Sequence, residues 1–175
     1  GALALDNIST AVAAVLASNL NITHAALSEG IQNAKLQGRF EVRQIQGKTV
    51  IFDAGHNPHG VEFLLKQLKQ SRVHQPQYTE VVSVFSMLTD KDIQSVTELL
   101  KDHIALWKIA ALDVPRAAPL AQLDTALRFN NVQHFDSVKL AFKSALDETN
   151  NNQLILVCGS FHTLEAVWEY LQECQ

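Results

Sequence analysis

A dense group of polar side chains occupies residues 53–59, directly after an apolar strand-like run and directly before a helical pattern. A carboxylate such as Asp53 at a strand end can accept hydrogen bonds from ribose hydroxyls, and the imidazole of His56 can donate to a phosphate or a carboxylate. Pro58 suits the first turn of a helix, whose free N–H groups favour anions. The segment therefore predicts a site for an anionic ligand. The competing interpretation is that Asp53 and Asn57 only cap the helix.

Three further segments place polar groups where they could contact a ligand. Arg39 follows Gly38 and is either a solvated linker residue or an anion clamp that moves when two domains close. Ser160 precedes a helical pattern, and its hydroxyl could hold a carboxylate or a phosphate, or simply cap the helix. Thr89 or Asp90 is better explained as a plain helix cap than as a ligand contact.

Several well-known catalytic patterns are absent from the sequence. It contains no P-loop motif, no Gly-x-Gly-x-x-Gly dinucleotide motif and no Gly-x-Ser-x-Gly nucleophile motif around Ser160. His56, His59 and His162 lack the spacing of a zinc centre, so we expect no metal site in this chain.

The elements that must position these residues form two unlike regions. Residues 1–37 read as two helices without an accompanying strand, and residues 38–175 alternate apolar strands with helices. This alternation predicts an α/β fold, a Rossmann-like three-layer domain of about six mostly parallel strands. A tight turn at residues 46–48 makes the first strand an antiparallel edge. The expected strands cover residues 40–45, 49–52, 81–85, 106–112, 132–135 and 154–158.

The helical region at residues 1–37 has two possible explanations. Its helices either pack against something outside the chain or form a self-contained helical hairpin. In the sheet region, ligands of open α/β folds bind beyond the carboxyl ends of the strands, where Asp53 and Ser160 lie.

Composition narrows the possible functions. Hydrophobic residues make up 47% and charged residues 18%, which is typical of a packed globular protein. A net charge of −4 without a basic stripe argues against nucleic acid as a partner. No apolar run approaches the roughly 18 residues of a membrane span. Two cysteines, Cys158 and Cys174, do not make a disulfide framework, so we expect a cytoplasmic protein.

Six segments of the chain resemble, in the same order along the sequence, segments in the C-terminal portion of bacterial bifunctional folylpolyglutamate synthases/dihydrofolate synthases, in the Mur ligase superfamily. Residues 52–59 resemble the Asp-Val-Ala-His-Asn-Pro-His signature of that family, with Gly55 in place of Ala. Gln37 stands where the family usually has Pro before Gly-Arg. The other matching segments are residues 6–11, 38–40, 87–92, 114–118 and 156–163.

The resemblance implies an ATP-dependent ligase that activates a folate or dihydropteroate carboxylate as an acyl phosphate, which the amine of L-glutamate then attacks. It implies that Asn7, Arg39 and Asp53 contact ATP, with Asp53 on the ribose and Arg39 reaching the phosphates. His56 and Ser160 correspond to residues tied to glutamate binding, and His56 and Arg39 are the candidate catalytic residues. A further, weaker candidate for an anion contact is the arginine of residues 114–118, Arg116.

The resemblance also implies what this chain lacks. The P-loop, the magnesium ligands and most of the pterin site belong to the N-terminal ATPase domain of the family, and residues 1–37 would be the tail of that domain. We therefore expect ATP and Mg²⁺ as cofactors of the longer protein, and no ATP turnover by this chain alone. The expected partners are small molecules, ATP, L-glutamate and dihydropteroate or a reduced folate, bound by a monomer.

Two other functions remain open on the sequence alone. One is a Mur ligase that adds an amino acid to a peptidoglycan precursor, although the Lys-Asp and Gly-Ser-Phe-His motifs favour folate. The other is a stand-alone Rossmann-like binding module without catalysis.

Overall fold

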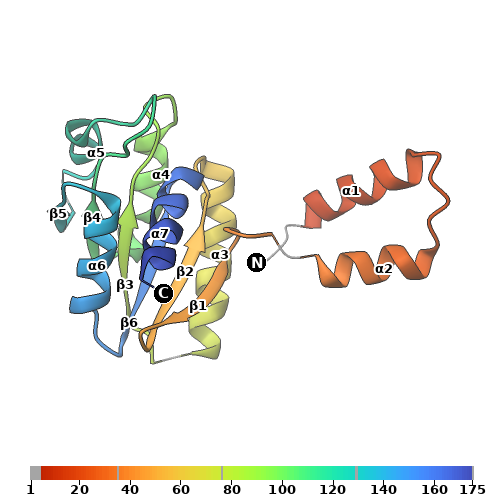
Figure 1. Ribbon diagram of the computed structural model, residues 1–175, viewed down its shortest axis with the longest axis horizontal. Helices are drawn as coiled ribbons and strands as arrows, with labels where there is room; N and C mark the ends of the chain where they lie inside the picture. The colour runs from red at the N-terminus through yellow and green to blue at the C-terminus, as the bar shows by residue number, and fades with distance from the viewer. Residues whose placement is uncertain (1–4, 35, 76, 129, 175) are drawn as a thin grey trace.

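The computed structural model describes residues 5–34, 36–75, 77–128 and 130–174, so residues 1–4 and 35 of the expected helical region lie outside the described part. Two helices, α1 (Leu5–Ala17) and α2 (His24–Asn33), run side by side and project away from a sheet domain that contains all the strands (Figure 1). Thr23 caps α2 by accepting a hydrogen bond from the backbone N–H of Ala26. The division into a helical and a sheet-containing region thus follows the sequence pattern.

The sheet has six strands in the order β1-β2-β6-β3-β4-β5, and only the edge strand β1 is antiparallel to its neighbour. Gln46 and Gly47, with φ of 50° and 75°, form the turn between β1 and β2. Positive φ at both central residues is the geometry of a tight hairpin, as the turn residues predicted. The strands are β1 (Glu41–Ile45), β2 (Lys48–Asp53), β3 (Glu80–Phe85), β4 (Leu106–Ile109), β5 (Val132–His134) and β6 (Gln153–Cys158).

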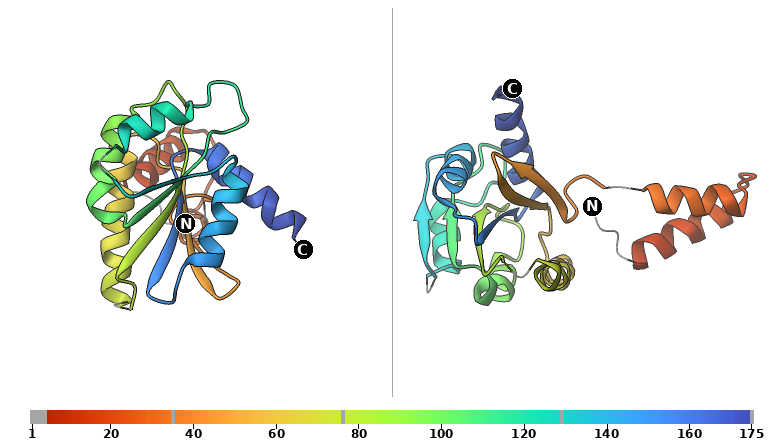
Figure 2. Two further views of the ribbon diagram at one scale, coloured as in Figure 1. Left: turned by 90° about the vertical axis from the view of Figure 1, so that its left-hand side faces the viewer. Right: turned by 90° about the horizontal axis from the view of Figure 1, so that it is seen from below.

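Helices cover both faces of the sheet, which confirms the predicted three-layer α/β fold (Figure 2). One face carries α3 (Pro58–His74), α4 (Ile93–Leu100) and α5 (Leu120–Ala126), with the short 3₁₀ helix η1 (Lys101–His103) after α4. The other face carries α6 (Val138–Glu148) and α7 (Phe161–Glu173). None of the described helices combines the length and the apolar character that a bilayer-spanning segment needs.

Alternate residues of the central strands supply two separate cores. In β2, Ile51 packs under α3 and α4, whereas Phe52 packs under α6 and α7. The largest buried side chain, Trp107, meets Phe85 edge-to-face with 5.2 Å between ring centroids. A fully buried side chain of this size contributes about 1.5–3 kcal/mol, so both faces of the sheet are firmly held.

Strand β4 is shorter than predicted, because it ends at Ile109 and not at Leu112. Ile109 pairs with the last residues of both neighbours, Phe85 and His134, so the chain beyond it has no strand to pair with. Leu112 stays buried in the loop, and its apolar character alone was therefore misleading.

Candidate functional site

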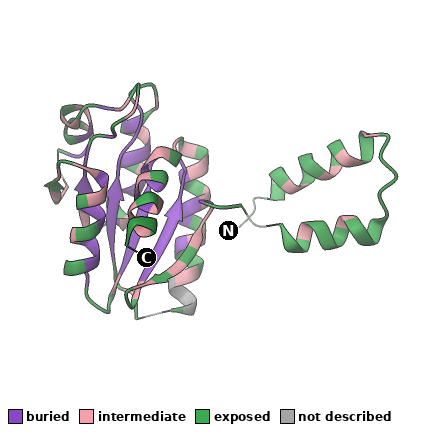
Figure 3. Ribbon diagram, viewed as in Figure 1, coloured by how far each residue is buried: buried purple, intermediate pink, exposed green. Residues whose placement is uncertain are grey.

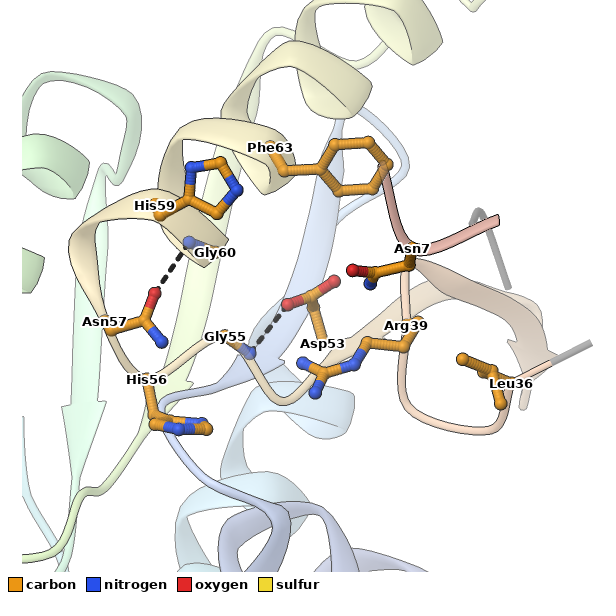
Figure 4. Close-up of a pocket in the computed structure, with 10 residues that line it drawn as sticks. All are labelled: Asn7, Leu36, Arg39, Asp53, Gly55, His56, Asn57, His59, Gly60 and Phe63. Carbon is orange, nitrogen blue, oxygen red and sulfur yellow. Dashed lines mark hydrogen bonds between the residues drawn. The ribbon is translucent and has the colours of Figure 1, made fainter. Parts of the chain in front are cut away.

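A pocket of about 160 Å³ opens at the carboxyl end of β2, where the helical region joins the sheet domain (Figure 4). Its walls come from α1, from the linker before β1, from the loop after β2 and from the first turns of α3. Four of the five predicted site residues, Asn7, Arg39, Asp53 and His56, line it together, whereas Ser160 does not. The other lining residues are Leu36, Gly55, Asn57, His59, Gly60 and Phe63.

Asp53 is the buried acid of the pocket, with only 3% of its surface exposed. Its carboxylate accepts the backbone N–H of Gly55 at 2.7 Å and that of Phe40 at 2.9 Å. Burial raises the pKa of Asp53, while these two hydrogen bonds and the positive charge of Arg39 act in the opposite direction. Each carboxylate oxygen keeps a second lone pair, so Asp53 can still accept hydrogen bonds from a ligand. Asp53 is therefore not the helix cap that the competing interpretation suggested.

Gly55 gives the pocket its tight floor beside Asp53. A Cβ atom at this position would lie 2.9 Å from Asp53 Oδ1 and 3.4 Å from the backbone carbon of Gly60. An alanine, which is usual in the resembling signature, would need the carboxylate to shift. The substitution of Gly for Ala in this chain therefore leaves Asp53 more room.

His56 and Asn57 have different roles although they are adjacent. His56 Nδ1 donates to the carbonyl of Ala54 at 3.0 Å, which leaves Nε2 to face a ligand. A neutral His56 of this tautomer accepts at Nε2, and it donates there only when it is protonated. Asn57 is the N-cap of α3, since its Oδ1 accepts the N–H of Gly60 at 2.8 Å, so the capping interpretation holds for this residue.

Arg39 is half-buried, and its side chain contacts the sheet domain. Its guanidinium lies over the ring of Phe161, 5.0 Å from the centroid. The preceding Gly38 is held by two hydrogen bonds, from its N–H to the carboxylate of Glu41 and from the N–H of Ala54 to its carbonyl, both at 2.9 Å. Arg39 thus projects from an anchored backbone.

Ser160 is buried and caps α7 instead of lining the pocket. Its Oγ accepts the N–H of Thr163 at 3.1 Å and lies 2.8 Å from Thr163 Oγ1. Because the Thr163 hydroxyl donates to the carbonyl of Ser86, the hydroxyl proton of Ser160 is directed to Thr163. In this conformation Ser160 has no proton left to donate to a substrate carboxylate.

The loop after β3 corrects one prediction. Neither Thr89 nor Asp90 caps α4; Asp92 does, by accepting the N–H of Ser95 at 3.0 Å. Asp90 instead forms ion pairs with Lys91 at 3.5 Å and with Arg116 at 3.3 Å. The helix begins later in the sequence than expected, because the chain first makes a further turn. In this turn the N–H of Lys91 donates a hydrogen bond to the carbonyl of Leu88.

Arg116 lies on the surface, away from the lining of the pocket. It has a φ of 64°, a left-handed conformation that is uncommon for a residue with a side chain. Its carbonyl accepts the N–H of Thr89 at 2.8 Å, which ties the loop after β4 to the loop after β3.

Phe63 lines the pocket although the sequence analysis did not single it out. Phe63 carried a usable signal, because it is an aromatic residue outside the apolar face of α3 formed by Val61, Leu64 and Leu68. Such a residue at the exposed side of an amphipathic helix often contacts something other than the core. His59, the last residue of the predicted segment 53–59, lies in the first turn of α3 and lines the pocket as well.

A known protein family matches the part of the chain that contains the sheet domain. The family described as "Mur ligase, glutamate ligase domain" matches residues 38–161, most of the chain. The chain belongs to this Mur ligase family. The match begins at Gly38, where the helical region ends and the sheet domain begins.

Relatives of known name are bifunctional synthases within the same family. The dihydrofolate synthase/folylpolyglutamate synthase of Escherichia coli (strain K12) is 39% identical over 165 residues, which cover 94% of this chain and 37% of that protein. A relative from Bacillus subtilis (strain 168) with the same name is 27% identical, over 87% of this chain and 34% of its own length. The chain thus spans little more than a third of the relatives that it matches.

Solved structures of similar proteins have the same fold. E. coli FolC in complex with DHPP and ADP superimposes with a TM-score of 0.85 at 37% identity, covering 98% of this chain and 40% of that one. A bifunctional folylpolyglutamate synthase/dihydrofolate synthase with Mn, AMPPNP and L-glutamate bound gives a TM-score of 0.83 at 33% identity, over 97% and 40% of the two chains.

Proposed function

We propose that this chain is the C-terminal part of an ATP-dependent amide ligase that adds L-glutamate to dihydropteroate or to a folate through an acyl phosphate. The observation that carries the proposal is that Asn7, Arg39, Asp53 and His56 line the same pocket. This pocket adjoins a domain of the glutamate ligase family. The relatives of the chain support folate as the substrate class, since they are named as dihydrofolate and folylpolyglutamate synthases. The proposal includes a cytoplasmic monomer that acts on these small molecules.

The side chains of the pocket suit one part of a nucleotide. Asp53 offers acceptor positions to ribose hydroxyls, Arg39 offers charged N–H donors to phosphates, and Asn7 adds an amide. The volume of about 160 Å³ is well below the roughly 300–1,000 Å³ of complete small-molecule sites. We therefore expect a second domain to contribute the rest of the ATP site.

The magnesium ion that accompanies ATP would be bound outside this chain. The resemblance places its ligands in the preceding ATPase domain. Among the described residues, no three His, Cys, Asp or Glu side chains are grouped so that they could hold a metal ion. The part of this chain in catalysis would be to bind and orient ATP and L-glutamate.

We infer that His56 contacts glutamate, and that it acts beside Arg39 as a catalytic residue. His56 lines the pocket from the loop after β2, and its Nε2 is free of the hydrogen bond to Ala54 (Figure 4). For Ser160, a direct contact with glutamate would require the hydroxyl to leave its hydrogen bond to Thr163. Arg116, the weaker candidate, would have to exchange Asp90 for a substrate carboxylate.

We further propose that residues 1–37 are the tail of the preceding ATPase domain. No described residue of α1 or α2 is buried, and an apolar groove of about 400 Å³ lies between the two helices. Short helices without a packed face are only marginally stable in water, so this region needs a partner surface. The apolar residues that line the groove are Ile8, Ala11, Val12, Val15, Ile22, Ala26, Leu27, Ile31, Ala34 and Leu36.

The decisive test is the substitution Asp53→Ala in the full-length ligase. Loss of a charge-assisted hydrogen bond to the ribose should raise the KM for ATP about tenfold or more. The measurement is ADP release as a function of ATP concentration, at saturating L-glutamate and dihydropteroate. An unchanged KM for ATP would remove Asp53 from the nucleotide site.

Ser137→Ala is the matched control for Asp53→Ala. Ser137 caps α6, is not among the residues that line the pocket, and accepts the N–H of Leu140 at 3.2 Å. Loss of this cap should cost about 1 kcal/mol of stability and leave the KM for ATP unchanged.

The same assay with tetrahydrofolate and with a muramyl nucleotide separates a folate ligase from a peptidoglycan ligase. Incorporation of glutamate only with the muramyl nucleotide would contradict the proposed substrate.

A further inference from the structure

Phe161 is an unusual residue at the edge of the candidate site. It is the first residue of α7, and 46% of its surface is exposed, although aromatic side chains of this size are normally covered. The following residues of α7 that face the sheet, Leu164 and Val167, are fully buried. Phe161 therefore belongs to the surface beside the pocket and not to the core.

The ring of Phe161 contacts the segment that carries Arg39. The Arg39 guanidinium lies 5.0 Å from the ring centroid, within the range of a cation–π interaction. On the same segment, a Cβ atom at Gly38 would lie 2.7 Å from Leu164 Cδ2 and 3.4 Å from Phe161 Cε1. Leu164 thus keeps the residue at 38 small, and the backbone there passes within contact distance of the Phe161 ring.

The contact with Phe161 leaves the N–H groups of Arg39 available. In the described part of the chain, the Arg39 guanidinium forms no hydrogen bond or ion pair; it contacts the ring of Phe161 and interacts electrostatically with Asp53. A guanidinium that lies on an aromatic ring keeps its five N–H donors at the edge of the plane, where they can reach an anion. Arg39 also lines the pocket with Asp53, and Figure 4 shows its side chain extending across the floor of that pocket.

We propose that Phe161 is a positioning residue for Arg39. Its ring holds the guanidinium beside the pocket, where the N–H groups can reach the nucleotide phosphates, before ATP arrives. This inference rests on the proposed nucleotide site and adds a residue that never touches the ligand. Its contribution is to reduce the number of orientations that Arg39 must give up when the phosphates bind.

The test compares two substitutions of Phe161 in the full-length ligase. Phe161→Leu keeps an apolar side chain that can pack on Gly38 but removes the ring face. Phe161→Tyr keeps the ring. We expect Phe161→Leu to raise the KM for ATP about three- to tenfold, while Phe161→Tyr stays within about twofold of the unchanged enzyme. The KM for L-glutamate should move by less than twofold in both variants.

A matched control is Leu140→Ala, which truncates another exposed apolar residue in the first turn of a helix, 49% exposed on α6. It should leave the KM for ATP unchanged, and melting temperatures of all variants should be compared. Phe161→Leu with an unchanged KM for ATP, or Phe161→Tyr as impaired as Phe161→Leu, would overturn the stacking role.

A double-mutant cycle separates failure of this inference from failure of the proposed site. Phe161→Leu should have no further effect on the KM for ATP in an Arg39→Ala background, because the ring acts through Arg39. Equal effects of Phe161→Leu in both backgrounds would contradict the inference and leave the nucleotide site intact. An Arg39→Ala enzyme with an unchanged KM for ATP would instead show that Arg39 does not contact the nucleotide, which contradicts both.

Discussion

The two regions of this chain differ in how they bury their apolar residues (Figure 3). The sheet domain encloses two cores, one on each face of the sheet, with Phe52, Trp107 and Phe142 completely covered. In the helical region, no described residue is buried, although its sequence is just as apolar in places. Of the eight exposed large hydrophobic residues in the described part of the chain, five belong to this region: Leu5, Leu16, Leu20, Ile22 and Leu36.

This difference shows that a sequence can specify helices without providing the contacts that stabilise them in a fold. Amphipathic periodicity is enough to specify α1 and α2, but it does not supply the surface against which they pack. The sheet domain supplies its own, because helices connect its parallel strands and return across both faces. The candidate site lies at the boundary of these two regions.

The largest expected effect is on the core of the sheet domain. Phe142→Ala removes a fully buried ring that contacts Phe52 and Tyr170, and should lower the free energy of unfolding by about 3–5 kcal/mol. Val15→Ala in α1 should lower it by less than about 1 kcal/mol, because Val15 is only half-buried. Urea unfolding of the 175-residue chain, followed by tryptophan fluorescence, measures both. Similar losses would mean that α1 is part of the same cooperative core.

Two glycines, one in each region, should respond in opposite ways to substitution by alanine. Gly159 has a φ of 106°, and a Cβ atom there would lie 2.4 Å from the carbonyl oxygen of Ser86. Gly159→Ala should therefore destabilise the chain by about 2–4 kcal/mol. Gly30 lies inside α2 with no atom within 4 Å of its Cβ position, so Gly30→Ala should stabilise the helix by about 0.5–1 kcal/mol.

Thermal unfolding monitored by circular dichroism distinguishes the two glycine variants. Gly30→Ala should increase helical signal without moving the main transition, since α2 does not contribute to the core. A shift of the main transition by Gly30→Ala as large as that caused by Gly159→Ala would contradict the separation of the two regions.

The smallest expected effect concerns a buried charge in the sheet domain. The ammonium of Lys108, with no exposed surface, contacts Glu148 at 2.7 Å, Gln133 at 2.6 Å and Ser144 at 2.8 Å. Lys108→Met should change the free energy of unfolding at neutral pH by less than about 1 kcal/mol. The desolvation cost of the charge disappears, and Glu148, 55% exposed, can be hydrated instead.

The acid sensitivity of this ion pair gives a second measurement. The hydrogen bond from Lys108, aided by that from Ser144, lowers the pKa of Glu148 from its usual 4.5. The resulting stabilisation is present above pH 4.5 and is lost as the pH falls through the lowered value in the folded state. Urea unfolding at several acidic pH values should show a weaker dependence in Lys108→Met. The same dependence in both proteins would contradict this assignment.

Much of the fold followed from the sequence because its signals were local. Alternation of apolar strands and helices gave the layers, and the turn at Gln46 and Gly47 made β1 antiparallel. The end of β4 was not predictable, since it depends on where Phe85 and His134 stop in the neighbouring strands. Strand ends are set by partners that are distant in the sequence.

The candidate site shows the same limit. The neighbourhood of Asp53 and His56 could be predicted because both follow one strand. The position of Ser160 could not, because the direction of its hydroxyl depends on Thr163 and on the carbonyl of Ser86. Sequence spacing locates a residue at a helix start, but only the three-dimensional structure shows where its proton is directed.

The anchoring of the linker has a mechanical consequence. Gly38 is bonded to Ala54, and the N–H of Phe40 is bonded to the carboxylate of Asp53 at 2.9 Å. Any swing of α1 and α2 relative to the sheet must therefore pivot before Gly38. Arg39 then stays with the sheet, whereas Asn7 moves with α1. Such a swing would open or narrow the pocket from one side only.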